Sequence, residues 1–242
     1  IGAHNVTIKE PFKDYHKNNK EIDILLYQAW GDTSSDKAIQ LASGLEEDLK
    51  KNIYGSGKVN ILAEYGYEGD PDTGLSKPPH DVILGGHTRR GACKALFMGM
   101  HFVAGFENTW GPYFRVAPDP KGASLIINIK KLFTEIIKFN ECAPRFDLLD
   151  EIFETNTEQS SKILCISNIK EDTVLIYLPE GGEASLNISH PDIKKACLFD
   201  TITGEMKETK EYEERAGKTV VFTPKESDDE GYDKDWIIII YK

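Results

Sequence analysis

Two kinds of hydrophobic pattern alternate along the first 146 residues. Nearly continuous apolar runs of strand length lie at 22–30, 59–67 and 101–106. Between and after them, apolar residues recur at helical spacing over 36–52, 88–100 and 122–139. Because strands and helices take turns, this part of the chain is predicted to form a parallel sheet covered by helices.

The pattern changes in residues 147–242. Short apolar segments such as "KILCISN", "TVLIYLP", "KTVVFTP" and "DWIIIIYK" are separated by turns rich in Gly, Asp and Pro. This spacing is typical of an antiparallel β-sandwich, whose usual size is about 100 residues. The fold class is therefore α/β plus all-β, with one domain at 1–146 and a second at 147–242.

Composition narrows the class of protein to which the chain can belong. With 242 residues and 40% hydrophobic content, the chain can bury a sizeable core. The stretch "LIINIKKLFTEIIKF" is broken by lysines and is shorter than the ~20 apolar residues of a membrane span, so no span is predicted. No cofactor motif is present. The four cysteines are far apart in the sequence and are predicted to be buried free thiols: Cys93, Cys142, Cys165 and Cys197.

The net charge of −11 comes entirely from residues 147–242. Residues 1–146 hold 18 acids and 18 Lys and Arg, which leaves 40−18 = 22 acids and 29−18 = 11 bases in 147–242. Because no basic patch or nucleic-acid motif accompanies this balance, nucleic acid is not an expected partner.

Polar and aromatic residues gather where the predicted parallel strands end. Glu64 ends one apolar run, and similar positions hold His4, Gln28, Trp30, Glu107, Asn108 and Trp110. Active sites of such folds lie at the carboxyl ends of the strands. Aromatic rings with carboxylate and amide partners suit a sugar, so a carbohydrate ligand is predicted. The alternative for Glu64 is a rim carboxylate paired with Arg89 or Arg90.

Several motifs together resemble the apiosidase-like glycoside hydrolases. "NILAEYGYEG" is similar to their E-P-x-Y-E-G strand motif, and "TRRGACKALFMGMHFVAGFENTWG" to the segment that follows it. "LFDTITGE" and "FTPKESDDEGYDKDWIIIIY" resemble elements of the C-terminal domain named for collagen binding. The resemblance covers nearly the whole chain, and Tyr65 stands where the family has proline.

This resemblance implies a retaining (β/α)8 barrel glycosidase followed by a β-sandwich. Glu64 matches the nucleophile at the end of strand seven. Substrate contacts are implied for His4, Gln28, Trp30, Tyr67, Glu68, Arg90, Asn108 and Trp110. For Glu68 an alternative is a loop carboxylate that holds backbone amides, and Arg90 could keep Glu64 ionised. Relatives are often exported, which suggests a secreted or periplasmic protein.

On this alignment the chain contains only about strands five or six to eight. An eight-stranded barrel needs about 200 residues or more, whereas 146 precede the sandwich. The acid/base carboxylate, which a retaining enzyme holds about 5–5.5 Å from the nucleophile, would lie upstream. The chain is therefore predicted to be the C-terminal portion of a glycosidase, with little activity alone.

Two other classes of function remain open. The chain could be a binding module with a vestigial barrel, or a structural protein whose sandwich braces the last barrel helix; bracing is favoured for the sandwich. Trp236 lies inside the final apolar segment, so a core role is predicted for it rather than a ligand platform. His87 is expected at the surface, next to Thr88 as a helix cap.

Overall fold

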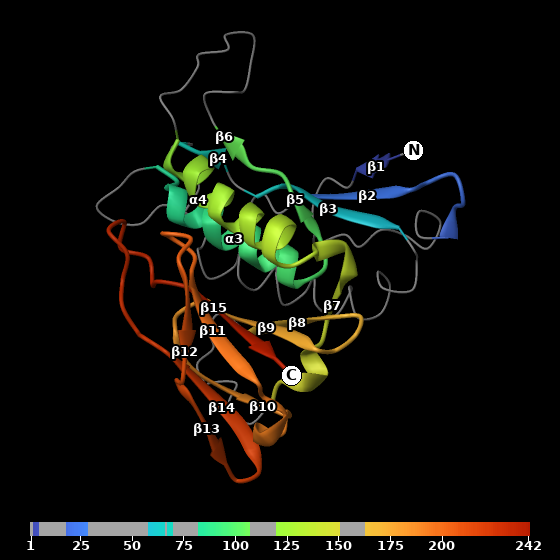
Figure 1. Ribbon diagram of the computed structural model, residues 1–242. Coiled ribbons are helices and arrows are strands. Elements are labelled where there is room, and N and C mark those ends of the chain that lie inside the picture. Colours follow the sequence, from blue (N-terminus) through green and yellow to red (C-terminus); the bar gives the residue numbers. More distant parts are fainter. Residues whose placement is uncertain are drawn as a thin grey trace. The chain divides into compact units, whose positions relative to one another are not determined.

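The computed structural model describes residues 2–4, 18–28, 58–65, 67–69, 82–106, 120–150 and 163–242. The chain divides into two compact units, Ile1–Ser124 and Leu125–Lys242 (Figure 1). The sequence places its domain boundary later, at 146/147. Strand β7 (Cys142–Pro144) accounts for part of this difference, because it pairs with a strand of the second unit's larger sheet.

A four-stranded parallel sheet organises the first unit. Its strands follow the order β1-β2-β3-β5, and every pairing between them is parallel. The strands are β1 (Gly2–His4), β2 (Ile24–Gln28), β3 (Val59–Glu64) and β5 (His101–Phe102). Helix α3 (Gly85–Phe97) connects the end of β3 to β5, as expected for a crossover between parallel strands.

The two faces of this sheet differ in exposure. Leu25 and Tyr27 of β2, and Leu62 of β3, lie on one face and are buried. The opposite face carries Ile24, Leu26 and Ile61, which are half-buried, together with Val59 at 44% exposure. Val103, just beyond β5, is 49% exposed. Because parallel sheets are normally covered on both faces, this apolar face is unusual.

A smaller parallel pair extends beyond the main sheet. Strand β4 (Tyr67–Glu68) pairs with β6 (Gly105–Phe106). The runs 59–67 and 101–106, each predicted as one strand, are therefore each divided into two. Helix α3 also begins at Gly85, three residues before the predicted start, and Leu84 precedes it without a side-chain cap.

Helix α4 (Lys121–Lys131) follows, and a π-helical turn (Leu132–Ile136) continues it to three residues before the end of the predicted helical segment, 122–139. Short 3-10 turns lie at Phe139–Glu141, Phe146–Leu148 and His190–Asp192. None of the helices that the structure describes has the length and apolar character that a bilayer crossing requires.

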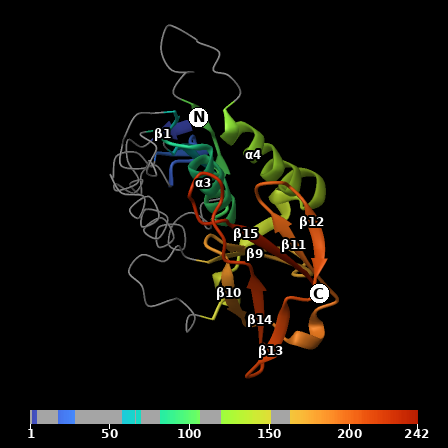
Figure 2. The ribbon, with the colours of Figure 1, turned by 90° about the vertical axis from the view of Figure 1, so that its left-hand side faces the viewer.

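Two antiparallel sheets form most of the second unit. The larger has the order β12-β11-β15-β9-β8-β7, and the smaller has the order β10-β14-β13, whose strands lie side by side in Figure 2. The strands are β8 (Leu164–Asn168), β9 (Thr173–Leu178), β10 (Gly182–Leu186), β11 (Lys195–Asp200), β12 (Met206–Thr209), β13 (Tyr212–Arg215), β14 (Lys218–Thr223) and β15 (Trp236–Tyr241).

Apolar residues from both sheets meet in one core. Val174 of β9, Leu186 of β10 and Val221 of β14 belong to it, and so do Trp236 and Ile238 of β15. Trp236 is 5% exposed, which confirms its predicted core role. Pairing two antiparallel sheets around a shared core is the arrangement of a sandwich.

The cysteines are free thiols, as predicted. Cys93, Cys165 and Cys197 are buried, and Cys142 is half-buried. Burial raises the pKa of the Cys142 thiol to about 11, and the neighbouring Glu141 carboxylate adds to the shift. Burial also raises the pKa of the Cys165 and Cys197 thiols. These three thiols therefore stay protonated at neutral pH, which is the inert state of a structural cysteine.

Candidate functional site

The parallel sheet brings three of the predicted positions to one edge. His4, Gln28 and Glu64 are the last residues of β1, β2 and β3. Gln28 and Glu64 are partners in the strand register. Their side chains lie outside the described residues, and Trp30, Asn108 and Trp110 lie outside them entirely.

The ladder is irregular next to Glu64. Tyr27 pairs with Leu62, whereas the next residue, Gln28, pairs with Glu64, so β3 carries one extra residue, Ala63, at this point. Such bulges disrupt the ladder locally and are over-represented beside active sites. Contacts outside the ladder therefore add to the pairing of Gln28 with Glu64 at the end of β3.

Tyr65 supplies such contacts. Its side chain is 7% exposed, and its ring stacks on His87 with centroids 4.6 Å apart and 11° between the planes. The ring of Phe102 approaches edge-on, at 6.2 Å and 68°. Burial raises the pKa of Tyr65 to about 12, although the positive charge of Arg90 acts in the opposite direction. Tyr65 is thus a neutral, packed side chain.

His87 is buried in the first turn of α3, so the prediction of a surface role is wrong. A hydrogen bond joins its ring to the backbone of Tyr65. Since Nε2 has no hydrogen-bond partner, the ring uses Nδ1 for this bond. Burial lowers the pKa of His87 to about 3, and the positive charges of Lys94 and Arg90 add to the shift. The imidazole is therefore neutral.

Thr88 does not cap the helix. It lies inside the first turn, with 1% exposure, and its hydroxyl has no hydrogen-bond partner. The helix starts earlier than the sequence pattern indicates, which moves both His87 and Thr88 from the predicted entrance of the helix into its packed interior.

Three cations are buried on α3: Arg89 at 1%, Arg90 at 8% and Lys94 at 3% exposure. Arg90 and Lys94 both act on His87 through their charge, which places them near the end of β3. The positions of His87, Arg90 and Lys94, three and then four residues apart, lie on one face of the helix. Arg90 is among the predicted site residues, whereas Lys94 is not, although helical spacing places Lys94 four residues after Arg90 on the same face.

Glu68 holds the start of helix α4. Its carboxylate oxygens accept hydrogen bonds from the Gly122 amide at 2.9 and 3.2 Å. A carboxylate is favourable at a helix N-terminus because it satisfies a free amide and complements the helix dipole. This geometry matches the alternative of a loop carboxylate that holds backbone amides.

Tyr67 is also packed against backbone. It is 8% exposed, and a Cβ added at Gly105 would lie 1.8 Å from its ring. The ring therefore occupies the space in which any other residue at 105 would place its side chain. Among the described residues, no group of His, Cys, Asp or Glu is arranged to hold a metal ion.

Comparison with known families finds a match in the second part of the chain. Residues 149–241 match the family described as "Putative collagen-binding domain of a collagenase". A search of curated proteins finds no significant match.

Solved structures match almost the whole chain. A glycoside hydrolase family 5 protein from Bacteroides vulgatus ATCC 8482 is similar with a TM-score of 0.66 and 18% identity, over 94% of this chain and 52% of that one. A second glycoside hydrolase has a TM-score of 0.61 and 18% identity, over 93% and 54%. A family 30 endoxylanase from Clostridium papyrosolvens C71 has a TM-score of 0.50 and 13% identity, over 100% and 56%.

At these identities the likeness is one of fold. The chain spans about half the length of the solved glycoside hydrolases that it matches. About half of each neighbour's chain therefore lies outside the part that shares its fold with this protein.

Proposed function

We propose that this chain is the nucleophile-bearing part of a retaining glycoside hydrolase, with Glu64 as the nucleophile. The observation that carries the proposal is the position of Glu64, at the carboxyl end of a parallel strand and beside a bulge. In open and closed parallel sheets this edge is where active sites form. The glycoside hydrolase folds that match nearly the whole chain support the same proposal.

The parallel sheet is proposed to be part of a (β/α)8 barrel, with 1–146 as the catalytic part and 147–242 as the sandwich. The apolar face formed by half-buried Ile24, Leu26 and Ile61 and by exposed Val59 supports this, because the strands of a barrel pack one face inward. On this proposal, further strands outside these 242 residues cover the face, and one of them carries the acid/base carboxylate.

The buried cations of α3 favour an ionised nucleophile. The charges of Lys94 and Arg90 lower the pKa of His87, and we propose that they act on Glu64 as well. A nearby positive charge lowers the pKa of a carboxyl group and keeps it in the anionic form that attacks an anomeric carbon.

A carbohydrate is the proposed substrate, and Glu64→Gln is the decisive variant. Turnover of nitrophenyl glycosides by the protein that includes the complementary part of the barrel should be lost in Glu64→Gln and kept in Glu135→Gln, an exposed carboxylate on the turn after α4. Proton NMR of the first product should show retained anomeric configuration. Undiminished turnover in Glu64→Gln, or an inverted product, contradicts the proposal. The 242-residue chain alone should show little turnover.

The second candidate is a non-catalytic protein whose sandwich binds a polymer. The match of residues 149–241 to a domain named for collagen binding is the observation in its favour. The burial of Trp236 favours bracing instead, because it removes a large aromatic ring from the surface. Affinity electrophoresis of the chain against plant and algal polysaccharides distinguishes the two, since retardation supports binding.

A further inference from the structure

Tyr65 directly follows Glu64, and α3 and β5 hold its ring from different sides. His87 stacks on one face of the ring, and Phe102 meets it edge-on. A Cβ added at Gly91 would lie 2.2 Å from Cδ1 and 2.3 Å from Cε1 of the ring. The ring therefore lies directly against the helix backbone, in space that only glycine leaves open.

The backbone of Tyr65 is held as well as its ring. A hydrogen bond to the Tyr65 backbone raises the pKa of His87 against the effect of burial, so one imidazole interacts with both the ring and the backbone of the same residue. Because one partner contacts both the ring and the backbone of Tyr65, a displacement of Tyr65 would disturb both contacts together.

The strand ladder is irregular just before Glu64. The extra residue of the bulge, Ala63, precedes Glu64, and bulged residues are released from regular pairing. The last register pair, Gln28 with Glu64, is therefore separated from the regular part of β3. The contacts of Tyr65, on the other side of Glu64 from the bulge, restrain the backbone where the ladder is irregular.

We propose that His87 and Gly91 form a clamp on Tyr65 that sets the backbone position of Glu64. His87 and Gly91 are positioning residues, since they act on Glu64 only through Tyr65. The clamp depends on the proposed function only for the role of Glu64 as nucleophile. Whether the backbone at Glu64 is held in this way is measurable without any turnover.

The experiment follows the Glu64 resonances by NMR in the 242-residue chain. Gly91→Ala pushes a methyl group into the ring, and His87→Phe keeps an aromatic ring but removes the hydrogen bond. Both should shift the Glu64 backbone amide and its side-chain carboxyl 13C signal. His87→Asn, which restores an N–H donor, should return the amide toward its wild-type position and would separate a specific bond from general packing.

Ala95→Gly is the matched control. Ala95 is fully buried in the same helix, so this change weakens α3 as glycine does in any helix, without a methyl group directed at Tyr65. Its Glu64 signals should stay at their wild-type positions. Thermal melting identifies any variant that does not fold; if Gly91→Ala is one, Tyr65→Leu, which removes the stacked ring, takes its place.

Unchanged Glu64 signals in Gly91→Ala or Tyr65→Leu would overturn the clamp, and so would equal shifts in the Ala95→Gly control. The clamp and the proposed function can fail separately. Turnover that survives Glu64→Gln removes the nucleophile but leaves the NMR result intact, whereas unperturbed Glu64 signals remove the clamp whatever the activity.

Discussion

The imidazole of His87 and the phenol ring of Tyr65 lie parallel, with centroids 4.6 Å apart. The pair joins the first turn of α3 to the residue after β3, and both side chains are buried. Such a contact requires an uncharged imidazole, because an imidazolium in this site would be desolvated beside the cations Arg90 and Lys94. The pair therefore links the stability of the fold to pH.

Acidification is expected to destabilise the protein through His87. Its pKa is lowered from 6.5 to about 3 in the folded state, so between these values the unfolded chain binds a proton that the folded chain does not. The contribution is complete above pH 6.5 and is lost as the pH falls toward 3, by about 1.4 kcal/mol per pH unit. Urea unfolding at a series of pH values measures this slope.

His87→Phe is the control for this slope. The variant should be less stable at neutral pH, since it lacks the bond to Tyr65, but its stability should fall less steeply below pH 6.5. Carboxylates with lowered pKa values, such as Asp172 and Asp200, contribute equally to both proteins. Parallel slopes for the two proteins would mean that His87 becomes protonated within the fold.

His87 also illustrates what sequence patterns capture and what they miss. The helical spacing in 88–100 predicts α3. The helix itself begins three residues earlier, at Gly85, which the pattern does not indicate because "GGH" contains no apolar residue that would extend it. Burial of His87 depends on Tyr65, 22 residues earlier in the chain. No local pattern contains that contact, which forms only when β3 and α3 pack.

The strands that the sequence predicts also differ from those that it does not in how much of their pattern is local. The run "WIIIIY" was correctly predicted as a strand because β15 is buried on both faces, with Ile237 and Ile239 on one side and Ile238 and Ile240 on the other. Strands β12 and β13 were missed, since "MKET" and "YEER" are exposed and polar. Their charges suit sheet edges, where they discourage pairing with other chains.

Glu68 should contribute to stability as a helix cap. Glu68→Ala removes both hydrogen bonds to the Gly122 amide, which should cost about 0.5–2 kcal/mol. Glu68→Gln keeps an acceptor oxygen but loses the charge, so it should cost less, about 0.3–1 kcal/mol. Hydrogen exchange at the Gly122 amide measures the effect locally. Glu135→Ala, on the exposed turn after α4, should leave that exchange unchanged; if it accelerates exchange as much as Glu68→Ala, the cap is not the cause.

The half-exposed apolar face of the parallel sheet should bind a hydrophobic dye. Val59 and Val103 are 44% and 49% exposed, and exposed apolar surface of this kind is normally covered. The double variant Val59→Lys and Val103→Lys should therefore lower the fluorescence of anilinonaphthalene sulfonate added to the chain. Ile169→Lys changes a residue of the second unit that is 77% exposed and serves as the control. An equal loss of fluorescence in the control would show that the dye binds elsewhere.

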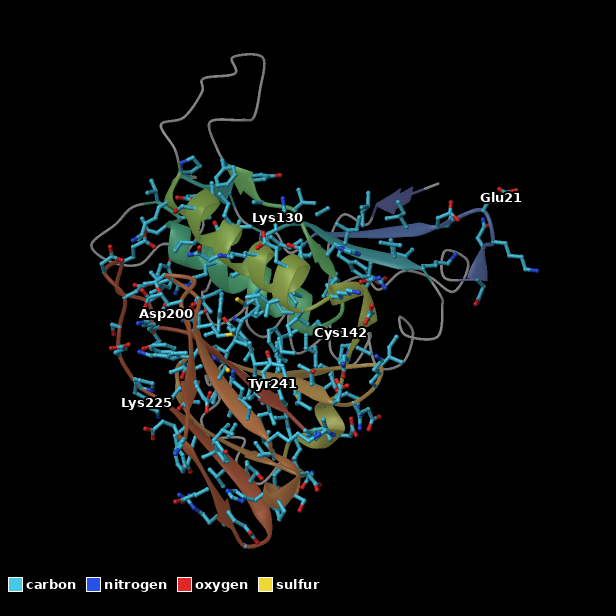
Figure 3. The ribbon with its side chains drawn as sticks, in the orientation of Figure 1. Glu21, Lys130, Cys142, Asp200, Lys225 and Tyr241 are labelled. Carbon is cyan, nitrogen blue, oxygen red and sulfur yellow. The ribbon has the colours of Figure 1, made fainter. Side chains whose placement is uncertain are left out.

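Asn128 and Gly204 should be energetically coupled within the second unit. The Asn128 side-chain amide donates to the Ile202 carbonyl at 2.7 Å. Ile202 lies in a turn in which the carboxylate of Asp200, labelled in Figure 3, accepts hydrogen bonds from the Ile202 and Thr203 amides. Asn128→Ala should cost about 1 kcal/mol, because it removes this bond. Gly204 has φ +73°, and a Cβ there would lie 2.7 Å from Asn128 Oδ1.

Gly204→Ala should therefore destabilise the chain for two reasons, the backbone conformation and the collision with Asn128. Gly217 has a similar φ of +78° but nothing within 4 Å of its added Cβ, so Gly217→Ala measures the conformational cost alone, about 1–2 kcal/mol. Asn128→Ala removes the Oδ1 and Cγ atoms, which lie 2.7 and 2.8 Å from the added Cβ, and leaves only the Cβ of residue 128 at 3.2 Å. In this background Gly204→Ala should therefore cost much less than in the wild type, and only somewhat more than Gly217→Ala. Urea unfolding of the double-mutant cycle gives the coupling, expected at about 0.5–3 kcal/mol. Additive losses would mean that the turn and α4 do not meet through this pair, and that α4 is braced by other contacts.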